Sequence, residues 1–149
     1  PCDMTKMPFS VAFVSESGEE LHSPQYAGAS VAEAAVGGVS RKGFTAHPPN
    51  HGQTHMQFLV NLAETPVAFH SFVGLRDGSQ SEGCVFRVLV NGEEVASRKM
   101  MPGQWEEISA DLTPWAEKTI LFSLVTDSDG PFNYDWAMWG EPRVDVVRR

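Results

Sequence analysis

The dipeptide Asn91-Gly92, set between two runs of alternating apolar and polar residues, constrains the fold of this chain more than any other feature. The run before it extends from Cys84 to Val90, and the run after it extends from Glu93 to Met100. An Asn-Gly pair suits the two central positions of a type I′ turn, because both positions need a positive φ. Apolar side chains at every second position suit a strand with one buried face. The sequence therefore predicts an antiparallel β-hairpin over residues 84–100.

The rest of the chain repeats this pattern of short alternating segments, separated by turn residues such as Gly, Pro, Asn and Asp. It shows no long helical period and no internal repeat. Short strands divided by turns are typical of an all-β fold, and we predict an antiparallel β-sandwich of about eight strands. The other predicted strands are Phe9–Val14, His55–Leu62, Val67–Leu75, Trp105–Leu112, Thr119–Thr126 and Tyr134–Val147.

Residues 19–42 leave the type of secondary structure open. The segment from Ala27 to Val36 is rich in alanine, which is the best helix former. The pair Gly37-Gly38 would end such a helix. We therefore consider a short helix here, with strand and loop as alternatives.

The length of 149 residues and the hydrophobic content of 42% suit one globular domain, so we expect a single domain over residues 1–149. The formal net charge of −8 disfavours nucleic acid and anionic membranes as partners, because like charges repel. The chain opens with Pro1 and shows no apolar targeting segment. We interpret it as a processed protein or as a piece of a larger one.

Two cysteines, Cys2 and Cys84, raise the question of a disulfide. A bridge between them would close a loop of about 80 residues and stabilise the fold by about 4.5 kcal/mol in the chain-entropy model. We favour two free thiols, with Cys84 buried as a small apolar side chain at the start of a strand.

Residues 133–144 concentrate the side chains that suit sugar binding: two indoles, a phenol, two carboxylates and a guanidinium. A sugar presents apolar ring faces that stack on aromatic rings, and hydroxyl edges that hydrogen-bond to polar side chains. Trp136 and Trp139 are three positions apart in one predicted strand, so they point to opposite faces and only one of them can face the core. The other indole is the predicted sugar platform, and alternation does not say which indole this is.

Three histidines, His47, His51 and His55, lie four positions apart, a spacing that aligns zinc ligands on a helix. Pro48 and Pro49 exclude a helix here, so the spacing loses its geometric meaning. We expect loop histidines at a binding rim, and His47 is the candidate ligand because it lies where a loop meets a strand.

The segment 126–130 resembles the start of a calcium loop, with Asp127 and Asp129 at alternate positions. The distal bidentate glutamate is missing at the required offset, which excludes an EF-hand. A solvated turn is the simpler interpretation. Because the two carboxylates lead into the aromatic run, we also consider them at the rim of the same site.

Sequence motifs for catalysis are absent: the chain has no Gly-x-Ser-x-Gly elbow and no glycine-rich phosphate loop. One enzyme class, the polysaccharide lyases, remains compatible with the residue types present. Tyr134 would then donate or accept the proton, His47 or His70 would be the base, and Arg76 would neutralise a uronate. We keep the lyase as one alternative and a purely structural or protein-binding sandwich as another.

Four short segments between about residue 38 and residue 147 resemble one known family in order along the chain. The family's glycine followed by His-Ala-Pro-Ser resembles residues 43–50, which read Gly-Phe-Thr-Ala-His-Pro-Pro-Asn. Its pattern Phe-x-x-x-Val-Gly-hydrophobic-x-Asp is similar to Phe69–Asp77. Its Phe-x-Val strand with an Asp-Gly hairpin matches Phe86–Val88 and Asn91-Gly92. Its terminal pattern Asp-His-Ala-Asp-Trp-Ala-Asp-Pro-Arg fits onto Asp135–Arg143 without gaps.

This family is the NPCBM family of carbohydrate-binding modules, which are appended to bacterial glycoside hydrolases. The resemblance implies a β-sandwich of the galactose-binding type, also called a jelly roll. It also implies galactose-type sugars as ligands and a structural calcium, for which Glu141 would be the carboxylate to test. The chain departs from the family at Trp136, where the family has His, and at Met138, where the family has Asp.

Residues and resemblance together predict a non-catalytic carbohydrate-binding module of a secreted or cell-surface bacterial protein. Its partner would be a carbohydrate, either a galactose-type sugar or an anionic polysaccharide, and the module would be linked to a larger carbohydrate-active enzyme. Calcium is the one predicted cofactor. The predicted ligand-binding residues are His47, Arg76, Asp77, Asp135, Trp136 and Trp139.

Overall fold

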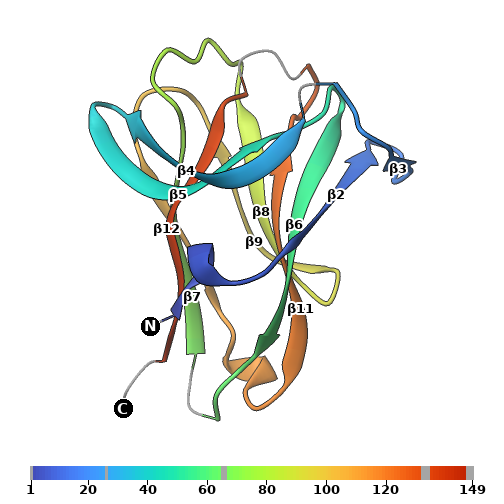
Figure 1. Ribbon diagram of the computed structural model, residues 1–149, viewed down its shortest axis with the longest axis vertical. Helices are drawn as coiled ribbons and strands as arrows, with labels where there is room; N and C mark the ends of the chain where they lie inside the picture. Colours follow the sequence, from blue (N-terminus) through green and yellow to red (C-terminus); the bar gives the residue numbers. More distant parts are fainter. Residues whose placement is uncertain (1, 26, 65–66, 132–134, 147–149) are drawn as a thin grey trace.

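The structure is a computed structural model, and it describes residues 2–25, 27–64, 67–131 and 135–146. The described residues form strands and two short 3₁₀ turns, and the strands make two sheets of six strands each (Figure 1). Every strand pair is antiparallel. The predicted all-β antiparallel sandwich is therefore confirmed. The described residues contain no helix long and apolar enough to cross a membrane.

The first sheet has β12 at its centre, with β7 on one side and β5 on the other (Figure 1). Its strands in spatial order are β10 (Glu106–Asp111), β7 (Val67–Leu75), β12 (Ala137–Val146), β5 (Val39–His47) and β4 (Gly28–Val36), and β1 (Cys2–Asp3) also pairs with β12. The second sheet contains, in order, β3 (Glu20–Leu21), β2 (Ser10–Ser15), β6 (Gly52–Asn61), β11 (Thr119–Asp127), β8 (Cys84–Val90) and β9 (Glu93–Met100). The 3₁₀ turns are η1 (Met4–Lys6) and η2 (Thr113–Trp115).

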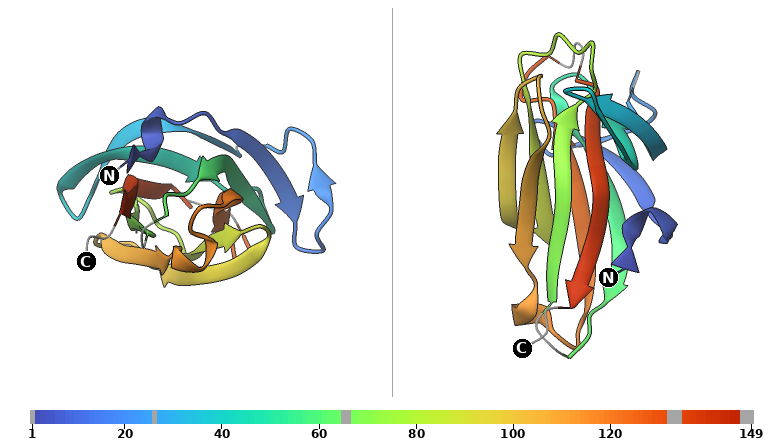
Figure 2. Two further views of the ribbon diagram at one scale, coloured as in Figure 1. Left: turned by 90° about the horizontal axis from the view of Figure 1, so that it is seen from below. Right: turned by 90° about the vertical axis from the view of Figure 1, so that its left-hand side faces the viewer.

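The core lies between the two sheets, which Figure 2 shows as two layers. Alternation along each strand sends one set of side chains into this space, as in β8, whose odd and even positions differ in burial throughout. Trp139 is the largest buried side chain, and its ring centroid lies 5.2 Å from that of Phe86 on the opposite sheet. The other fully buried rings are Phe44, Phe58, Phe69 and Phe122. Trp115 of η2 is partly buried and packs against this core.

The hairpin predicted from Asn91-Gly92 is confirmed, with strand bounds that coincide with the two alternating runs. Asn91 has φ of 51° and Gly92 has φ of 84°, as a two-residue type I′ turn requires. The predicted strand Val67–Leu75 is also confirmed without change as β7.

The helix considered for Ala27–Val36 is wrong, because residues 28–36 form strand β4. The backbone of β4 pairs with β5 along its whole length, from Gly28 opposite His47 to Val36 opposite Val39. Gly37 and Gly38, with φ of 59° and 78°, make the two-residue turn between the strands. The Gly-Gly pair is thus a hairpin signal and not a helix stop, and pairing with a neighbour outweighs the weak helix preference of alanine.

The disulfide alternative is wrong, since both cysteines are free thiols. Cys2 is exposed on β1 of the first sheet, whereas Cys84 is buried at the start of β8 in the second sheet. Burial raises the pKa of the Cys84 thiol well above its usual value, so this side chain is an uncharged part of the core.

Candidate functional site

Three adjacent strand ends of the first sheet bring three of the predicted residues together. Met138 of β12 faces Thr45 of β5 on one side and Gly74 of β7 on the other. Trp136 lies two positions before Met138. His47 lies two positions after Thr45, and Arg76 lies two positions after Gly74. Because side chains alternate, these three share the face of Met138, which is opposite to the core and is called the outer face here.

The pairing of β7 with the chain before β12 continues beyond the regular strands. The backbone N–H of Arg76 donates a hydrogen bond to the carbonyl oxygen of Trp136, with an N···O distance of 2.8 Å. The right-hand view of Figure 2 shows β7 and β12 side by side, with the end of β7 and the start of β12 at the same end of the sandwich. We call the group of His47, Arg76 and Trp136 the strand-end site.

Trp136 is partly exposed and held in place from two directions. The guanidinium carbon of Arg76 lies over the indole, 4.7 Å from the ring centroid, which is a cation–π contact. Gly78 follows in the loop after β7 with φ of +92°, and a Cβ atom there would lie 3.4 Å from Cζ3 of Trp136. The loop thus passes close to the edge of the indole. A ring positioned in this way is a platform that already has a charged donor beside it.

His47 is half-buried at the end of β5. Its Nδ1 lies 2.8 Å from the carbonyl oxygen of Pro48 and donates the hydrogen bond, because a carbonyl can only accept. Burial lowers the pKa of His47, and the positive charge of Arg76 lowers it further, while the bond to Pro48 opposes the shift. The charge of Arg76 therefore reaches the imidazole of His47.

Asp77, one of the predicted ligand-binding residues, has a structural role. Its Oδ1 accepts a hydrogen bond from the backbone N–H of Gly37 at 2.7 Å, and its Oδ2 accepts one from Gly38 at 2.9 Å. Its own N–H donates to the carbonyl of Ala35 at 2.8 Å. Asp77 therefore fastens the β4–β5 turn to the end of β7.

Asp135 is only 1% exposed, so the prediction that it contacts a ligand is wrong. It shares the inward parity of Trp139, and Ser81 donates a hydrogen bond to its Oδ1. Its Oδ2 is buried and has no partner among the described residues. Burial raises the pKa of Asp135 to about 6, with smaller contributions from the charges of Asp127 and Asp129, although the bond from Ser81 lowers it.

Trp139 is 0% exposed, so the prediction that it serves as a sugar platform is wrong as well. Its Nε1–H donates to Oγ1 of Thr126 at 3.2 Å, which satisfies the one polar group of the indole inside the core. The expectation that one indole of this strand faces the core and the other does not is confirmed. The tertiary structure assigns Trp139 to the core and Trp136 to the outer face.

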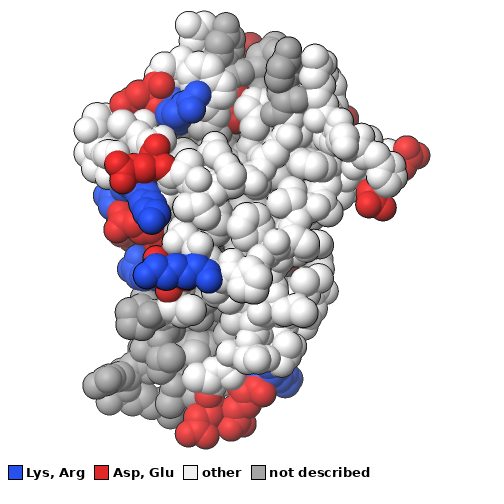
Figure 3. Space-filling model, in the orientation of Figure 1, with Lys and Arg blue, Asp and Glu red and all other residues white. Residues whose placement is uncertain are grey.

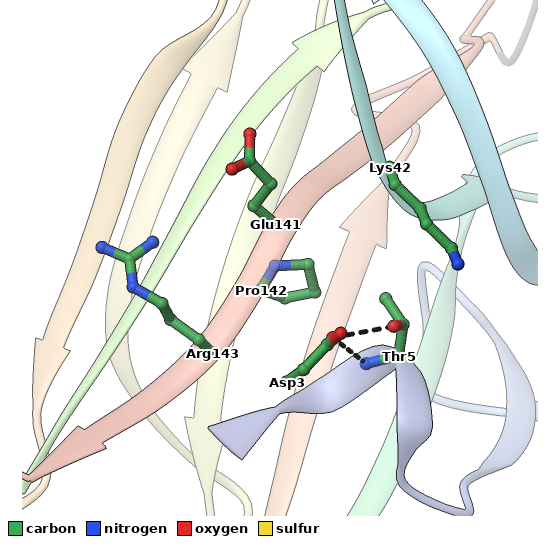
Figure 4. Close-up of a pocket in the computed structure, with 6 residues that line it drawn as sticks. All are labelled: Asp3, Thr5, Lys42, Glu141, Pro142 and Arg143. Atoms are coloured by element: carbon green, nitrogen blue, oxygen red, sulfur yellow. Dashed lines mark hydrogen bonds between the residues drawn. The ribbon is translucent and has the colours of Figure 1, made fainter. Parts of the chain in front are cut away.

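Glu141 lies at a β-bulge of β12, between Gly140 and Arg143, and has φ of 50°. It lines a hollow of about 300 Å³, whose lining side chains are drawn in Figure 4. The hollow is lined by Asp3, Thr5, Lys42, Glu141, Pro142 and Arg143. Oε2 of Glu141 accepts from Nη1 of Arg41 at 2.5 Å, and the carboxylate of Asp3 accepts from Thr5.

These surroundings of Glu141 do not fit a calcium ion. Calcium takes six to eight oxygen ligands, whereas the carboxylate of Glu141 is paired with Arg41, and Lys42 and Arg143 also line the hollow beside it. Within residues 2–25, 27–64, 67–131 and 135–146, no three side chains of His, Cys, Asp or Glu are placed to hold a metal ion.

The remaining candidates lie away from the strand-end site. His55, on the second sheet, is 2.8 Å from Gln53, and His51 is 3.3 Å from Glu16. Asp127 pairs with Arg87 at 3.0 Å and Asp129 pairs with Lys99 at 2.9 Å. These residues are engaged by the second sheet and its loops.

Of the residues in the lyase alternative, His47 and Arg76 are the two that the structure brings together. His70 lies six residues before Arg76 along β7, which is about 20 Å in an extended strand. His70 therefore does not lie beside Arg76, and Tyr134, the predicted proton donor or acceptor, is not among the described residues.

Trp105 lies on the same outer face. A Cβ atom on Gly74 or on Gly140 would come within 3.0–3.2 Å of its ring, so the indole lies directly over two glycines. Its Nε1–H donates to the carbonyl of Val39 at 2.7 Å. Two glycines at nearby positions of β7 and β12 are a signal for a ring lying close to the sheet, and the sequence analysis did not use this signal.

Residues 28–145 of this chain match the family model of the NPCBM/NEW2 domain. The structure is similar to that of CBM51 from Clostridium perfringens GH95 in complex with methyl-galactose, with a TM-score of 0.65 and 14% identity, over 96% of this chain and 98% of that one. It is also similar to CBM51-2 in complex with GlcNAc from Clostridium perfringens ZmpB, with a TM-score of 0.63 and 16% identity, over 95% of this chain and 30% of that one. At these identities the similarity shows a shared fold.

A curated relative is an uncharacterized protein of Archaeoglobus fulgidus, which is 30% identical over 81 residues. The matched segment is 46% of this chain and 20% of that protein. This chain therefore corresponds to a small part of the relative.

Proposed function

Because this chain belongs to the NPCBM/NEW2 domain family, we propose that it is a non-catalytic module that binds a carbohydrate at the strand-end site. The observation that carries the proposal is the position of Trp136. Its indole is partly exposed on the outer face and held beside Arg76, while Trp139 of the same strand is buried. An aromatic ring next to hydrogen-bond donors can stack on a sugar ring and orient its hydroxyls.

The ligand class follows from the same group of residues. Arg76 supplies several N–H donors and His47 supplies an imidazole, so the site favours a ligand rich in acceptor oxygens. The similar CBM51 structures hold methyl-galactose and GlcNAc. Both ligands are pyranose sugars, which supports a pyranose as the ligand of this chain.

The expected affinity is low. One aromatic platform with a few hydrogen bonds on an open face suggests a Kd of about 10 μM to 1 mM. Useful avidity then needs several modules or several sugar copies, because a linked second contact benefits from a high effective concentration.

The biological role would be to hold an attached enzyme close to its substrate. The similar CBM51 domain comes from a protein named GH95, and CBM51-2 belongs to a chain more than three times as long as the matched part. We extend this arrangement to the present chain as a module of a secreted or cell-surface glycoside hydrolase or a similar enzyme.

A glycan array followed by calorimetry on the best ligand tests the proposal. Trp136→Ala should weaken binding at least tenfold, because it removes the platform, and Trp136→Phe should weaken it less. Trp105→Phe is the matched control, since Trp105 is another indole of the outer face with its own hydrogen bond to Val39.

Binding that is unchanged in Trp136→Ala and lost in Trp105→Phe would move the site to the centre of the sheet. An array without any bound glycan, measured with folded protein, would reject sugar binding and favour a structural or protein-binding sandwich.

A further inference from the structure

The charge of Arg76 is unbalanced, in contrast to other arginines of this chain. Arg41 pairs with Glu141, Arg87 pairs with Asp127 and Glu94, and Arg98 pairs with Glu106. In the face drawn in Figure 3, Lys and Arg side chains likewise lie beside Asp and Glu. In the part of the chain that the structure describes, no carboxylate lies within 4.0 Å of the guanidinium of Arg76.

The two carboxylates nearest to Arg76 in sequence register are already engaged. Both oxygens of Asp77 accept backbone N–H groups of the β4–β5 turn. Asp135, next to Trp136, is buried and bonded to Ser81. Neither side chain is placed to neutralise the guanidinium.

Arg76 is also held in a way that suits recognition of an anion. It is exposed, and its guanidinium lies over the indole of Trp136. A guanidinium that rests on an aromatic ring keeps its N–H donors at its rim, and these donors match the two oxygens of a carboxylate. His47 faces the same space and gains a proton more readily when an anion is close by.

We propose that the strand-end site selects acidic sugars, with the carboxylate of a uronate bound to Arg76 beside His47 while the sugar ring lies against Trp136. This inference rests on the proposed function and adds the chemical class of the ligand.

The acidic character of the whole protein does not prevent this selection. The net charge of −8 is spread over the surface, and at about 0.1 M salt charges more than about 10 Å apart are largely screened. A carboxylate in contact with Arg76 interacts at hydrogen-bond distance, where charge-assisted bonds are roughly twice as strong as neutral ones. The local contact therefore outweighs the distributed repulsion.

The test compares two methyl glycosides that differ at one carbon, the methyl glycoside of galacturonic acid with its carboxyl group ionised and unesterified, and the methyl glycoside of galactose, by calorimetry or NMR titration at pH 7.5. The galacturonide should bind about tenfold more tightly than the galactoside. Arg76→Gln should reduce this ratio to about one, because it should weaken binding of the galacturonide much more than binding of the galactoside. Arg76→Lys, which keeps the charge and loses the planar fork, should give an intermediate ratio.

Arg98→Gln is the matched control, because Arg98 is another exposed arginine and lies on β9 of the other sheet. It should leave the ratio unchanged. Raising the salt from 0.05 M to 0.5 M should weaken binding of the galacturonide and leave binding of the galactoside as it was. Circular dichroism shows that each variant is folded.

The outcomes separate this inference from the proposed function. Equal binding of both glycosides, weakened by Trp136→Ala and indifferent to Arg76→Gln, overturns the selection of acidic sugars and leaves sugar binding intact. Failure of both glycosides and of the glycan array overturns both proposals. A ratio that collapses in Arg76→Gln alone supports the inference.

Discussion

The two faces of the first sheet use neighbouring indoles of one strand for opposite purposes. On the inner face, Trp139 is fully buried and its single N–H donates to Thr126. On the outer face, Trp136 is partly exposed and lies under a guanidinium. The same kind of side chain therefore stabilises the core in one place and remains partly exposed in the other. The difference comes from the parity of the strand and from the side of the sheet on which the second sheet packs.

The carboxylates follow the same division. Asp135 shares the inner face with Trp139, is removed from water and has a raised pKa. Asp77, which is exposed, is bound to the backbone of a turn. Neither forms an ion pair with Arg76, so among the described residues this cation of the outer face has no counter-ion of its own. Four substitutions test this difference between the two faces.

Trp139→Ala should have the largest effect on stability, since it empties the centre of the core. Removing a buried Trp costs about 3–5 kcal/mol of unfolding free energy, and here it also leaves the hydroxyl of Thr126 without its donor. Urea unfolding measures the change. A loss below about 1 kcal/mol would contradict the assignment of Trp139 to the core.

Asp135→Asn should stabilise the protein at pH 8 by roughly 1–3 kcal/mol. The folded state binds the proton of Asp135 more tightly than the unfolded chain does, because the pKa rises from 3.8 to about 6. The stability of the wild type should therefore fall as the pH rises from about 4 to about 6, and Asn removes this dependence.

Unfolding midpoints from pH 3.5 to pH 8 provide the measurement for Asp135. The amide oxygen of Asn can still accept the hydrogen bond from Ser81, so the variant tests charge and not packing. Identical pH profiles for the variant and the wild type would reject the burial of a titrating carboxyl at this position.

Asp77→Ala should destabilise the fold by about 1–2 kcal/mol, because two backbone N–H groups of the turn at Gly37 and Gly38 lose their acceptor. Sugar affinity should change less than it does in Arg76→Gln. Hydrogen exchange should speed up at the amides of the turn. Faster exchange confined to other regions would show that Asp77 does not fasten this hairpin.

Trp136→Ala should have the smallest effect on stability, within about 1 kcal/mol, because it removes an exposed ring and one cation–π contact. Its effect should appear in sugar binding instead. Trp136 and Trp139 would then separate binding from stability within one strand, and a loss of several kcal/mol in Trp136→Ala would remove the distinction between the two faces.

Local signals in the sequence were sufficient for much of the fold. The Asn91-Gly92 hairpin and β7 were predicted with their bounds, since a type I′ turn and strict alternation depend on neighbours in the chain. Strand β4 was left open beside a helix and a loop, because alanine has a helix preference that its pairing with β5 outweighs. Resemblance to the NPCBM family identified the sandwich and covered residues 38–147, and the family match extends from 28 to 145.

The candidate site could be predicted only in part. His47, Arg76 and Trp136 come together, whereas Asp135 and Trp139 were proposed for the same surface and are buried. Gly78 and Ser81, which pack against or bond to site residues, gave no signal in the sequence, because their roles depend on contacts across the fold.

The sequence by itself determined the strand periodicity, the hairpin turn and the rule that the two indoles of β12 lie on opposite faces. These properties follow from backbone geometry over a few residues. The tertiary structure alone decided which indole is buried, because that depends on the side of the sheet where the second sheet packs. It also left Arg76 without a carboxylate partner, since Asp77 and Asp135 are bound by groups up to 54 residues away along the chain.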